Sequence, residues 1–274
     1  MARWPEGFSE GTGVLPRTIA IGNCSYAVEE GAHRRFWKRV NSGVWEPETF
    51  AIFDEFIGGE SLFLDVGAWI GPTALYGVQR AARCIAFEPD PLAFAELEAN
   101  VAANRGQVWV EKLELHQCAI NSDGRSFILG GRGEGGDSMS SALFPNRTSR
   151  WTVEARRLHD VLATERQPGQ PVFIKIDIEG GEYELLPAIG DIIADPLVTA
   201  YVSFHPRMLR NSLAATNDPM KASVIYVDQH LSVIESLPWS RRIAGSDGAE
   251  IKRDALEDGL KRHSMFPREI LIRS

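Results

Sequence analysis

The chain has 274 residues, of which 44% are apolar and 24% are charged, the ordinary proportions of a globular protein. This composition excludes an intrinsically disordered chain, a collagen and a coiled coil. The formal net charge is −8. Because phosphate binding needs clustered Lys and Arg, this charge argues against a dedicated nucleic-acid surface.

Cysteine usage and the lengths of apolar runs bear on the compartment. Cys24, Cys84 and Cys118 are odd in number and show no metal-ligand spacing, so we expect neither a disulfide framework nor a zinc site. The amino terminus lacks an apolar stretch of signal-peptide length. The longest apolar run, residues 197–204, is far shorter than the roughly 20 residues that span a bilayer. We therefore expect a cytoplasmic protein that does not enter a membrane.

The first part of the chain is expected to form an extension in front of the main domain. Residues 1–45 are rich in glycine and aromatic residues, which favours irregular structure with short elements. Residues 47–57 begin with proline and carry apolar residues on one helical face, so they predict a helix. We expect residues 1–57 to be an extension that covers a substrate, and residues 58–274 to form one domain.

From residue 61 onward, short apolar runs alternate with helical patterns. This alternation predicts an α/β fold with a mainly parallel sheet covered by helices on both faces. Because no helical pattern is evident between the last two strand-like runs, we expect them to pair as an antiparallel hairpin at one edge. The predicted strands are residues 62–66, 83–87, 172–177, 198–204, 231–234 and 269–272, with two or three more between 107 and 129.

A glycine-containing turn follows the first of these strands, at the sheet edge where open α/β sheets bind ligands. The strand ends in Asp65-Val-Gly67-Ala-Trp-Ile-Gly71 and opens into a helix. Gly67 permits a tight turn, and Gly71 permits a close approach of the helix. The second strand ends at Glu88, whose carboxylate could accept two hydrogen bonds from a ribose. Together these features predict a nucleotide-type ligand, although each glycine could also be only a turn residue.

Trp69 distinguishes between ligands of this type. A dinucleotide fingerprint has glycine at the equivalent position, so that the pyrophosphate can approach the backbone. The pattern here is instead similar to the D-x-G-x-x-x-G signature of class I S-adenosylmethionine-dependent methyltransferases, whose cofactor carries no phosphate. The cofactor's ammonium and sulfonium groups favour nearby carboxylates, a role that would suit Asp65. An NAD-dependent oxidoreductase remains the alternative, as does a non-catalytic protein that retains the fold.

A second block extends the resemblance. The segment Phe173-Ile-Lys-Ile-Asp177-Ile-Glu179-Gly-Gly-Glu182-Tyr-Glu-Leu-Leu186 resembles the K-I-D-x-E-G-x-E-x-x-x-L block of FkbM-type methyltransferases. Further similar features are Asp65-Val-Gly-Ala, Phe87-Glu-Pro-Asp-Pro, Asn100 with Asn104, and Ser138-Met-Ser-Ser141, so that the similarity runs from about residue 60 to about 206.

This resemblance implies a fold, an activity and a cofactor site. The fold would be a doubly wound, seven-stranded class I methyltransferase sheet, mostly parallel, with a carboxyl-terminal antiparallel hairpin. The activity would be S-adenosylmethionine-dependent O-methylation in natural product biosynthesis, with a sugar or polyketide-like small molecule as acceptor and neither nucleic acid nor membrane as partner. The cofactor-binding residues would be Asp65, Gly67, Ala68, Gly71, Glu88, Ala119 and Ser138.

Methyl transfer to a hydroxyl needs a base, because an alcohol is nearly un-ionised at neutral pH. The candidates at predicted strand ends are His205, Asp177 and Glu179, with Glu182 close by in the sequence. The ordinary pKa of histidine lies nearest neutrality. However, many relatives carry an acid just before this histidine and this chain does not, so the choice among the three stays open. Asp177 could instead hold a divalent metal, but without a second acid pair we expect none.

Four further expectations concern the surroundings of this site. The glycine-rich residues 130–141 would form a lid rather than a phosphate cradle, because they lack a Gly-Lys-Ser ending. The extension and residues 207–220 would form the walls of the substrate pocket. Lys175 would be structural and paired with a carboxylate, and Pro187 would kink the helix after the acidic block. The oligomeric state is left open.

Overall fold

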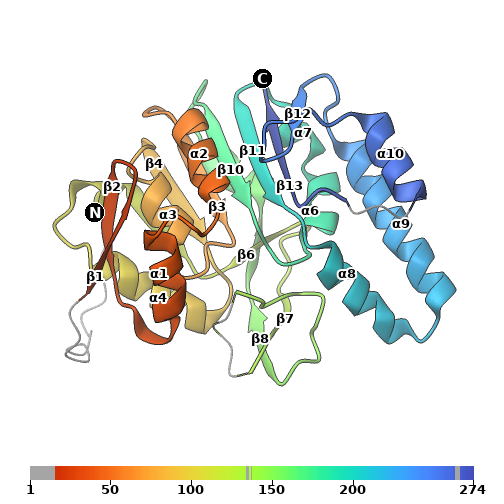
Figure 1. Ribbon diagram of the computed structural model, residues 1–274, viewed down its shortest axis with the longest axis horizontal. Coiled ribbons are helices and arrows are strands. Elements are labelled where there is room, and N and C mark those ends of the chain that lie inside the picture. The colour runs from red at the N-terminus through yellow and green to blue at the C-terminus, as the bar shows by residue number, and fades with distance from the viewer. Residues whose placement is uncertain (1–15, 134–135, 137, 263–265) are drawn as a thin grey trace.

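A seven-stranded sheet forms the centre of the computed structural model, which describes residues 16–133, 136, 138–262 and 266–274 (Figure 1). The strand order is β12-β13-β11-β10-β3-β4-β5, and β13 runs antiparallel to both neighbours while the pairs from β11 to β5 are parallel. The predicted doubly wound, mostly parallel sheet is therefore confirmed. Its strands are β3 (Leu62–Val66), β4 (Arg83–Phe87), β5 (Leu113–His116), β10 (Val172–Ile176), β11 (Val198–Ser203), β12 (Arg242–Ala244) and β13 (Glu269–Arg273).

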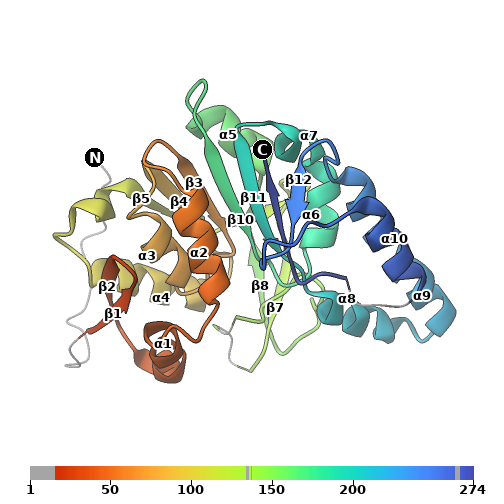
Figure 2. The same cartoon turned by 45° about the horizontal axis from the view of Figure 1, so that its top comes forward.

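The parallel register brings three strand ends together. Val66, the last residue of β3, is paired with Phe87 at the end of β4 and with Ile176 at the end of β10. Consequently the residues that follow these strands, Gly67, Glu88 and Asp177, emerge at the same edge of the sheet. Figure 2 shows these strands from a second direction.

Helices cover both faces of the sheet, and the side chains of the strands alternate between two apolar cores. Leu64 of β3 belongs to the core beneath α6 and α9, whereas Phe63 belongs to the core beneath α1 to α4. The helices on the Phe63 side are α1 (Arg34–Asn41), α2 (Pro47–Phe56), α3 (Pro72–Gly77) and α4 (Pro91–Ala102). Those on the other side are α5 (Leu158–Glu165), α6 (Glu182–Ala188), α7 (Gly190–Ala194), α8 (Pro206–Leu213), α9 (Pro219–Ser236) and α10 (Arg253–Lys261).

Shorter elements complete the described chain. A hairpin of β1 (Arg17–Ile21) and β2 (Cys24–Val28) precedes α1. Two small sheets lie between β5 and β10 in sequence: β6 (Ala119–Asn121) pairs with β9 (Ala155–Arg157), and β7 (Phe127–Gly131) pairs with β8 (Ser149–Val153). The single-turn 3-10 helices are 31–33, 108–112 and 214–216. No helix of the described chain is long and apolar enough to cross a membrane.

The described part of the extension shares its core with the sheet. Trp37 of α1 and Phe53 of α2 are fully buried in the same cluster as Phe63. Asn104, two residues after the end of α4, accepts a hydrogen bond from the backbone N–H of Ala27 at 2.7 Å and donates one to the carbonyl of Ala27 at 2.7 Å. These contacts fix the hairpin and α1 on the sheet, beside the edge where the strands end.

Two local predictions meet different outcomes. Residues 231–234 are not a strand but lie within α9, and the partner of β13 is β12, with α10 between them. A short apolar run is compatible with either element, and here Asp218, whose side chain caps the helix by accepting from Lys221 N at 3.0 Å, starts a helix. Pro187, where a kink was expected, lies inside α6, and the helix ends one residue later at Ala188.

Candidate active site

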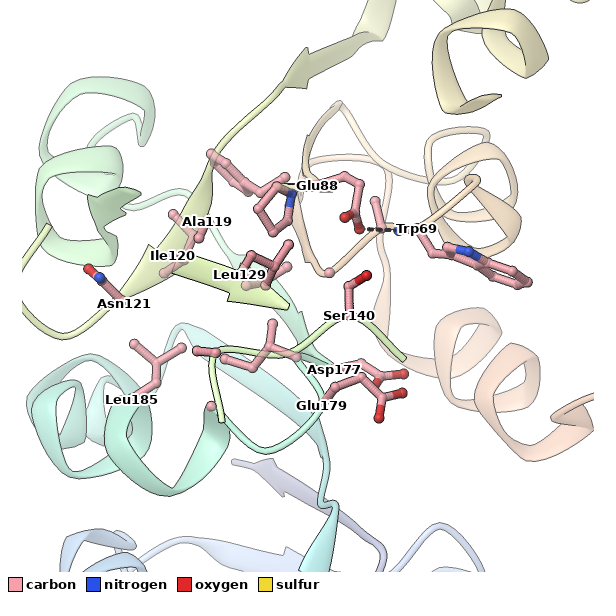
Figure 3. Close-up of a pocket in the computed structure, with 18 of the residues that line it drawn as sticks. Trp69, Glu88, Ala119, Ile120, Asn121, Leu129, Ser140, Asp177, Glu179 and Leu185 are labelled. Carbon is pink, nitrogen blue, oxygen red and sulfur yellow. Dashed lines mark hydrogen bonds between the residues drawn. The ribbon is translucent and has the colours of Figure 1, made fainter. Parts of the chain in front are cut away.

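The edge where β3, β4 and β10 end opens into a cavity of about 940 Å³. Figure 3 shows Glu88 and Trp69 at one side of it and Asp177 and Glu179 at the other, with Ser140 between them in this view. The lining also includes Gly67, Ala68, Ala119, Ser138 and His205. The structure therefore brings eight of the ten predicted site residues to one cavity, all except Asp65 and Gly71.

The turn after β3 is held by the neighbouring strand ends. The N–H groups of Gly67 and Ala68 both donate to Phe87 O at 3.0 Å. Gly67 has φ +82°, and a Cβ there would lie 1.9 Å from Asp177 O. Glycine is therefore required by the close packing of this turn against the segment after β10, as well as by its backbone conformation.

Glu88 presents a buried carboxylate to the cavity. One oxygen accepts from Trp69 N at 2.8 Å and the other from Asp90 N at 2.8 Å. Burial raises the pKa of Glu88 to about 7, and the two backbone N–H groups offset only part of that effect. Each carboxylate oxygen can still accept a further hydrogen bond. The side chain is thus fixed in place and able to bind a diol.

Asp65 lies beneath the cavity and does not line it. Its side chain is fully buried, accepts from Thr73 Oγ1 at 2.7 Å and lies 3.2 Å from Lys175 Nζ. Lys175 also donates to Gly67 O at 2.8 Å, so this ion pair supports the turn from below. The expectation that Asp65 faces the cofactor's cations is therefore replaced by a structural role, because Lys175 already supplies its positive partner. The predicted pairing of Lys175 with a carboxylate is present.

Gly71 also lies behind the cavity wall. It begins α3 with φ +95°, and a Cβ there would lie 2.6 Å from Leu97 Cδ1. It permits the close approach of α3 to α4 and does not itself line the cavity.

The glycine-rich loop is tied to the turn after β3, although residues 134, 135 and 137 lie outside its described part. Trp69 Nε1 donates to Gly136 O at 3.0 Å. Asp90 accepts from Gly136 N at 3.1 Å and from Ser140 Oγ at 2.6 Å. Ser138 is exposed and lines the cavity, as does Ala119 at the start of β6. These contacts place the described part of the loop along the cavity, as expected of a lid.

Asp177, Glu179 and His205 form a cluster in the cavity lining, and Figure 3 shows Asp177 and Glu179 across the cavity from Glu88. His205 Nε2 lies 3.5 Å from Asp177 Oδ1 and 3.5 Å from Glu179 Oε1. The donor atoms of the three side chains lie within 4.8 Å of one another, close enough for a divalent cation to bridge them. Glu179 reaches this position with φ +52°, a conformation that is uncommon outside glycine.

Glu182 fixes the orientation of the His205 ring. This carboxylate is fully buried and accepts from Ile178 N at 2.9 Å, from Gly180 N at 2.8 Å and from His205 Nδ1 at 3.0 Å. Burial alone would lower the pKa of His205, but the hydrogen bond and charge of Glu182, together with Asp177 and Glu179, raise it to about 10.

The surrounding carboxylates therefore favour a protonated His205 at neutral pH, which argues against its expected role as the base. Its Nε2 faces the carboxylates of Asp177 and Glu179. The sequence could not show this, because the three carboxylates that hold the proton lie 23 to 28 positions away in the chain.

Part of the cavity wall comes from the extension, as the sequence predicted. The sequence did not indicate which residues of the extension line the cavity. Phe36 and Arg39 of α1 line the cavity together with Trp45 and Glu46. The ring of Phe36 packs edge-on against the rings of Trp69 and Trp45, with distances between ring centroids of 4.5 Å and 5.0 Å respectively. By contrast, no residue of 207–220 lines the cavity, because α8 turns away onto α9. The predicted contribution of that segment is wrong.

The sheet order and the site at its carboxyl edge define an α/β fold of the class I methyltransferase type. The family model of the methyltransferase FkbM domain matches residues 65–230, more than half of the chain. The chain therefore belongs to the FkbM methyltransferase family, a family of class I S-adenosylmethionine-dependent methyltransferases. A search of the curated proteins found no match.

Several solved structures are similar to this chain at low identity and with TM-scores below 0.5. A methyltransferase FkbM from Methylobacillus flagellatus KT is 13% identical, with a TM-score of 0.44, over 89% of this chain and 56% of that chain. A Pyrococcus abyssi tRNA (uracil-54, C5)-methyltransferase in complex with S-adenosyl-L-homocysteine is 11% identical, with a TM-score of 0.38, over 95% of this chain and 44% of that chain. A geranyl diphosphate methyltransferase is 9% identical, with a TM-score of 0.40, over 89% of this chain and 85% of that chain. This chain thus spans little more than half of the Methylobacillus protein, and similarity at this level does not identify an acceptor.

Proposed function

We propose that this protein binds S-adenosylmethionine and transfers its methyl group to a hydroxyl of a small molecule, a sugar or a polyketide-like natural product. The observation that carries the proposal is the shared cavity. The turn after β3 and the Glu88 carboxylate lie on one wall, and the Asp177, Glu179 and His205 cluster lies on another. A cofactor site and a proton-handling site therefore open into the same space.

The residues of the first wall fit such a cofactor. Glu88 can accept hydrogen bonds from two ribose hydroxyls, and the turn at Gly67 and Ala68 leaves the backbone open to the cavity. Apolar side chains of Ile120 and Leu129 can pack against an adenine ring. Trp69 occupies the position where a dinucleotide site needs glycine, which disfavours NAD. The bound cofactor would supply an electrophilic methyl group on sulfur.

The second wall supplies groups that can hold an acceptor hydroxyl. The imidazolium of His205 can donate a hydrogen bond from Nε2, and the carboxylates of Asp177 and Glu179 can accept one from the acceptor. Most of the rate enhancement would come from holding the hydroxyl oxygen in line with the methyl group. Removal of the hydroxyl proton would add the contribution of a general base.

The acceptor is proposed to be small because of the size and lining of the cavity. A volume of about 940 Å³ lies at the upper end of the range of small-molecule sites, roughly 300–1,000 Å³, so a cofactor and a modest acceptor can share it. The aromatic rings of Phe36 and Trp45 offer apolar surface, and the acidic cluster offers hydrogen-bond acceptors for hydroxyls. Acceptors with several hydroxyl groups fit this combination best.

Calorimetry followed by a transfer assay tests the proposal. S-adenosylhomocysteine should bind with one site per chain, and NAD should not bind. The protein should then transfer a labelled methyl group to at least one member of a panel of methyl glycosides and macrolactones, and mass spectrometry should locate the label on oxygen. Tight binding of NAD, or cofactor binding without transfer to any of these acceptors, would contradict the proposal.

A further inference from the structure

Glu46 is an acidic residue of the extension and lies outside the cluster of Asp177, Glu179 and His205. It is the last residue before α2 and lines the cavity that also contains Asp177 and His205. Solvent reaches its side chain through the opening of the cavity. The carboxylate is therefore available to a bound acceptor, although it comes from a segment outside the part of the chain that the family model matches.

The backbone of Glu46 has an unfavourable conformation. Its φ of +44° and ψ of +52° lie in the left-handed region, whereas a residue before proline normally adopts extended geometry. The described chain has four non-glycine residues with positive φ, and three of them, Glu46, Trp69 and Glu179, line this cavity. Such strain persists where the surroundings impose it, and it is concentrated at functional sites.

The side chain of Glu46 is held from the sheet. Thr49 Oγ1 donates to Glu46 Oε2 at 3.2 Å. The Thr49 hydroxyl lies 3.2 Å from the hydroxyl of Tyr201, a buried residue of β11. Because Thr49 uses its proton on Glu46, Tyr201 donates to Thr49. This chain of hydrogen bonds positions one carboxylate oxygen and leaves Oε1 without a hydrogen bond to the described residues.

The charges around Glu46 favour a carboxyl group that gains and loses a proton near neutrality. The pKa of Glu46 is about 7, because partial desolvation of the carboxyl group inside the cavity raises it, Asp177 and Glu269 raise it further, and Lys175 and Thr49 lower it. Tyr201 also lies within electrostatic range, and Arg39 lines the same cavity. His205 holds its proton far above this pH. Of these two groups, Glu46 is the one able to exchange a proton under physiological conditions.

We infer that Glu46 is the general base that accepts the proton of the acceptor hydroxyl. This inference rests on the proposed O-methyl transfer. As the hydroxyl oxygen forms its bond to the methyl carbon, the bond from that carbon to sulfur breaks, and its electron pair stays on sulfur as a neutral thioether. The hydroxyl proton passes to Glu46 and leaves to solvent through the open cavity. Asp177, Glu179 and His205 orient the acceptor.

Glu46→Gln tests the assignment, with Glu48→Gln as the matched control. Glu48 is also an exposed acid at the start of α2 and does not line the cavity, so both variants remove the same charge from the same helix end. With an acceptor from the glycoside and macrolactone panel, Glu46→Gln should lower kcat about 10²–10⁴-fold while leaving KM within a few-fold. Glu48→Gln should retain the wild-type rate. Both should bind S-adenosylhomocysteine as the wild type does and keep its melting temperature.

Three results would overturn the assignment. They are a wild-type rate in Glu46→Gln, a raised KM with kcat retained in that variant, or a complete loss of wild-type activity in the presence of chelator that is reversed by added metal.

A second experiment needs no acceptor and uses carbon-13 spectra of the glutamate carboxyl groups in protein loaded with S-adenosylhomocysteine. One signal that titrates near pH 7 should vanish in Glu46→Gln and persist in Glu48→Gln, and its absence from the wild type would also reject the base. Failure of the proposed function would appear separately, as absence of S-adenosylhomocysteine binding or of any transfer.

Discussion

Gly67→Ala should destabilise the fold at the point where cofactor site and catalytic wall meet. The added Cβ would lie 1.9 Å from Asp177 O, and Cβ atoms essentially never approach another atom within 3.0 Å, so the two strand ends must move apart. The φ of +82° costs a non-glycine residue roughly 1–2 kcal/mol. Separation would also weaken the Asp177 N to Val66 O bond and the Lys175 Nζ to Gly67 O bond. These contribute roughly 1 and 1.5–3 kcal/mol, so complete loss of both would bring the total to roughly 3.5–6 kcal/mol.

Urea denaturation measures this loss, and Gly59→Ala is the control. Gly59 has no positive φ, and its Cβ would meet no atom within 4 Å, so that substitution should change the free energy of unfolding by less than about 0.5 kcal/mol. Calorimetry at a temperature where both variants are folded should show weaker S-adenosylhomocysteine binding for Gly67→Ala alone. A loss of less than about 1 kcal/mol with normal ligand affinity would refute the argument, because it would mean that the turn can move without cost.

Three further predictions concern the same site. Burial raises the pKa of Glu88 to about 7, so the ionised carboxylate that accepts ribose hydrogen bonds is lost as the pH falls below that value. Calorimetry should therefore show that S-adenosylhomocysteine binds about tenfold more weakly at pH 6 than at pH 8. Glu88→Gln should abolish that pH dependence, and its persistence would remove Glu88 from the ligand site. Lys175→Met should lower the free energy of unfolding by about 3–5 kcal/mol, since it leaves the buried Asp65 without its cation, and addition of Asp65→Asn should recover part of the loss. Trp69→Phe retains the ring contacts but loses the hydrogen bond to Gly136 O, so it should lower the free energy of unfolding by only about 1 kcal/mol. Amide hydrogen exchange at Ser141 should become faster in this variant. Unchanged exchange would mean that Trp69 does not hold the loop.

The extension gives this chain a cavity that the sheet alone would not enclose. Phe36, Trp45 and Glu46 all precede residue 65, where the match to the family model begins, yet they share the cavity with Asp177 and Glu179. We therefore propose that the extension, besides covering the acceptor, supplies part of the chemistry. Acceptor preference would then depend on residues that the family motif does not contain.

The sequence alone determined the central strands and the turn after β3. Residues 62–66 and 83–87 were predicted with the bounds that the structure has, because continuous apolar runs that end in glycine or acidic residues are local signals. The order of motifs along the chain also indicated the family correctly. The same local reasoning misassigned residues 231–234, where an apolar run of four residues suits a helix as well as a strand.

Only the tertiary structure decided what the individual groups at the site do. Asp65 became a buried partner of Lys175, and His205 became a cation, because each depends on side chains brought close by the parallel register of the strands. Glu46 joined the cavity because α2 packs on the sheet. Secondary structure follows from neighbours a few residues away, whereas the pKa and exposure of a side chain depend on residues distant in sequence that folding places within a few ångströms. That is why the sequence predicted where the site lies, whereas only the structure shows the surroundings that set the pKa of each of its groups.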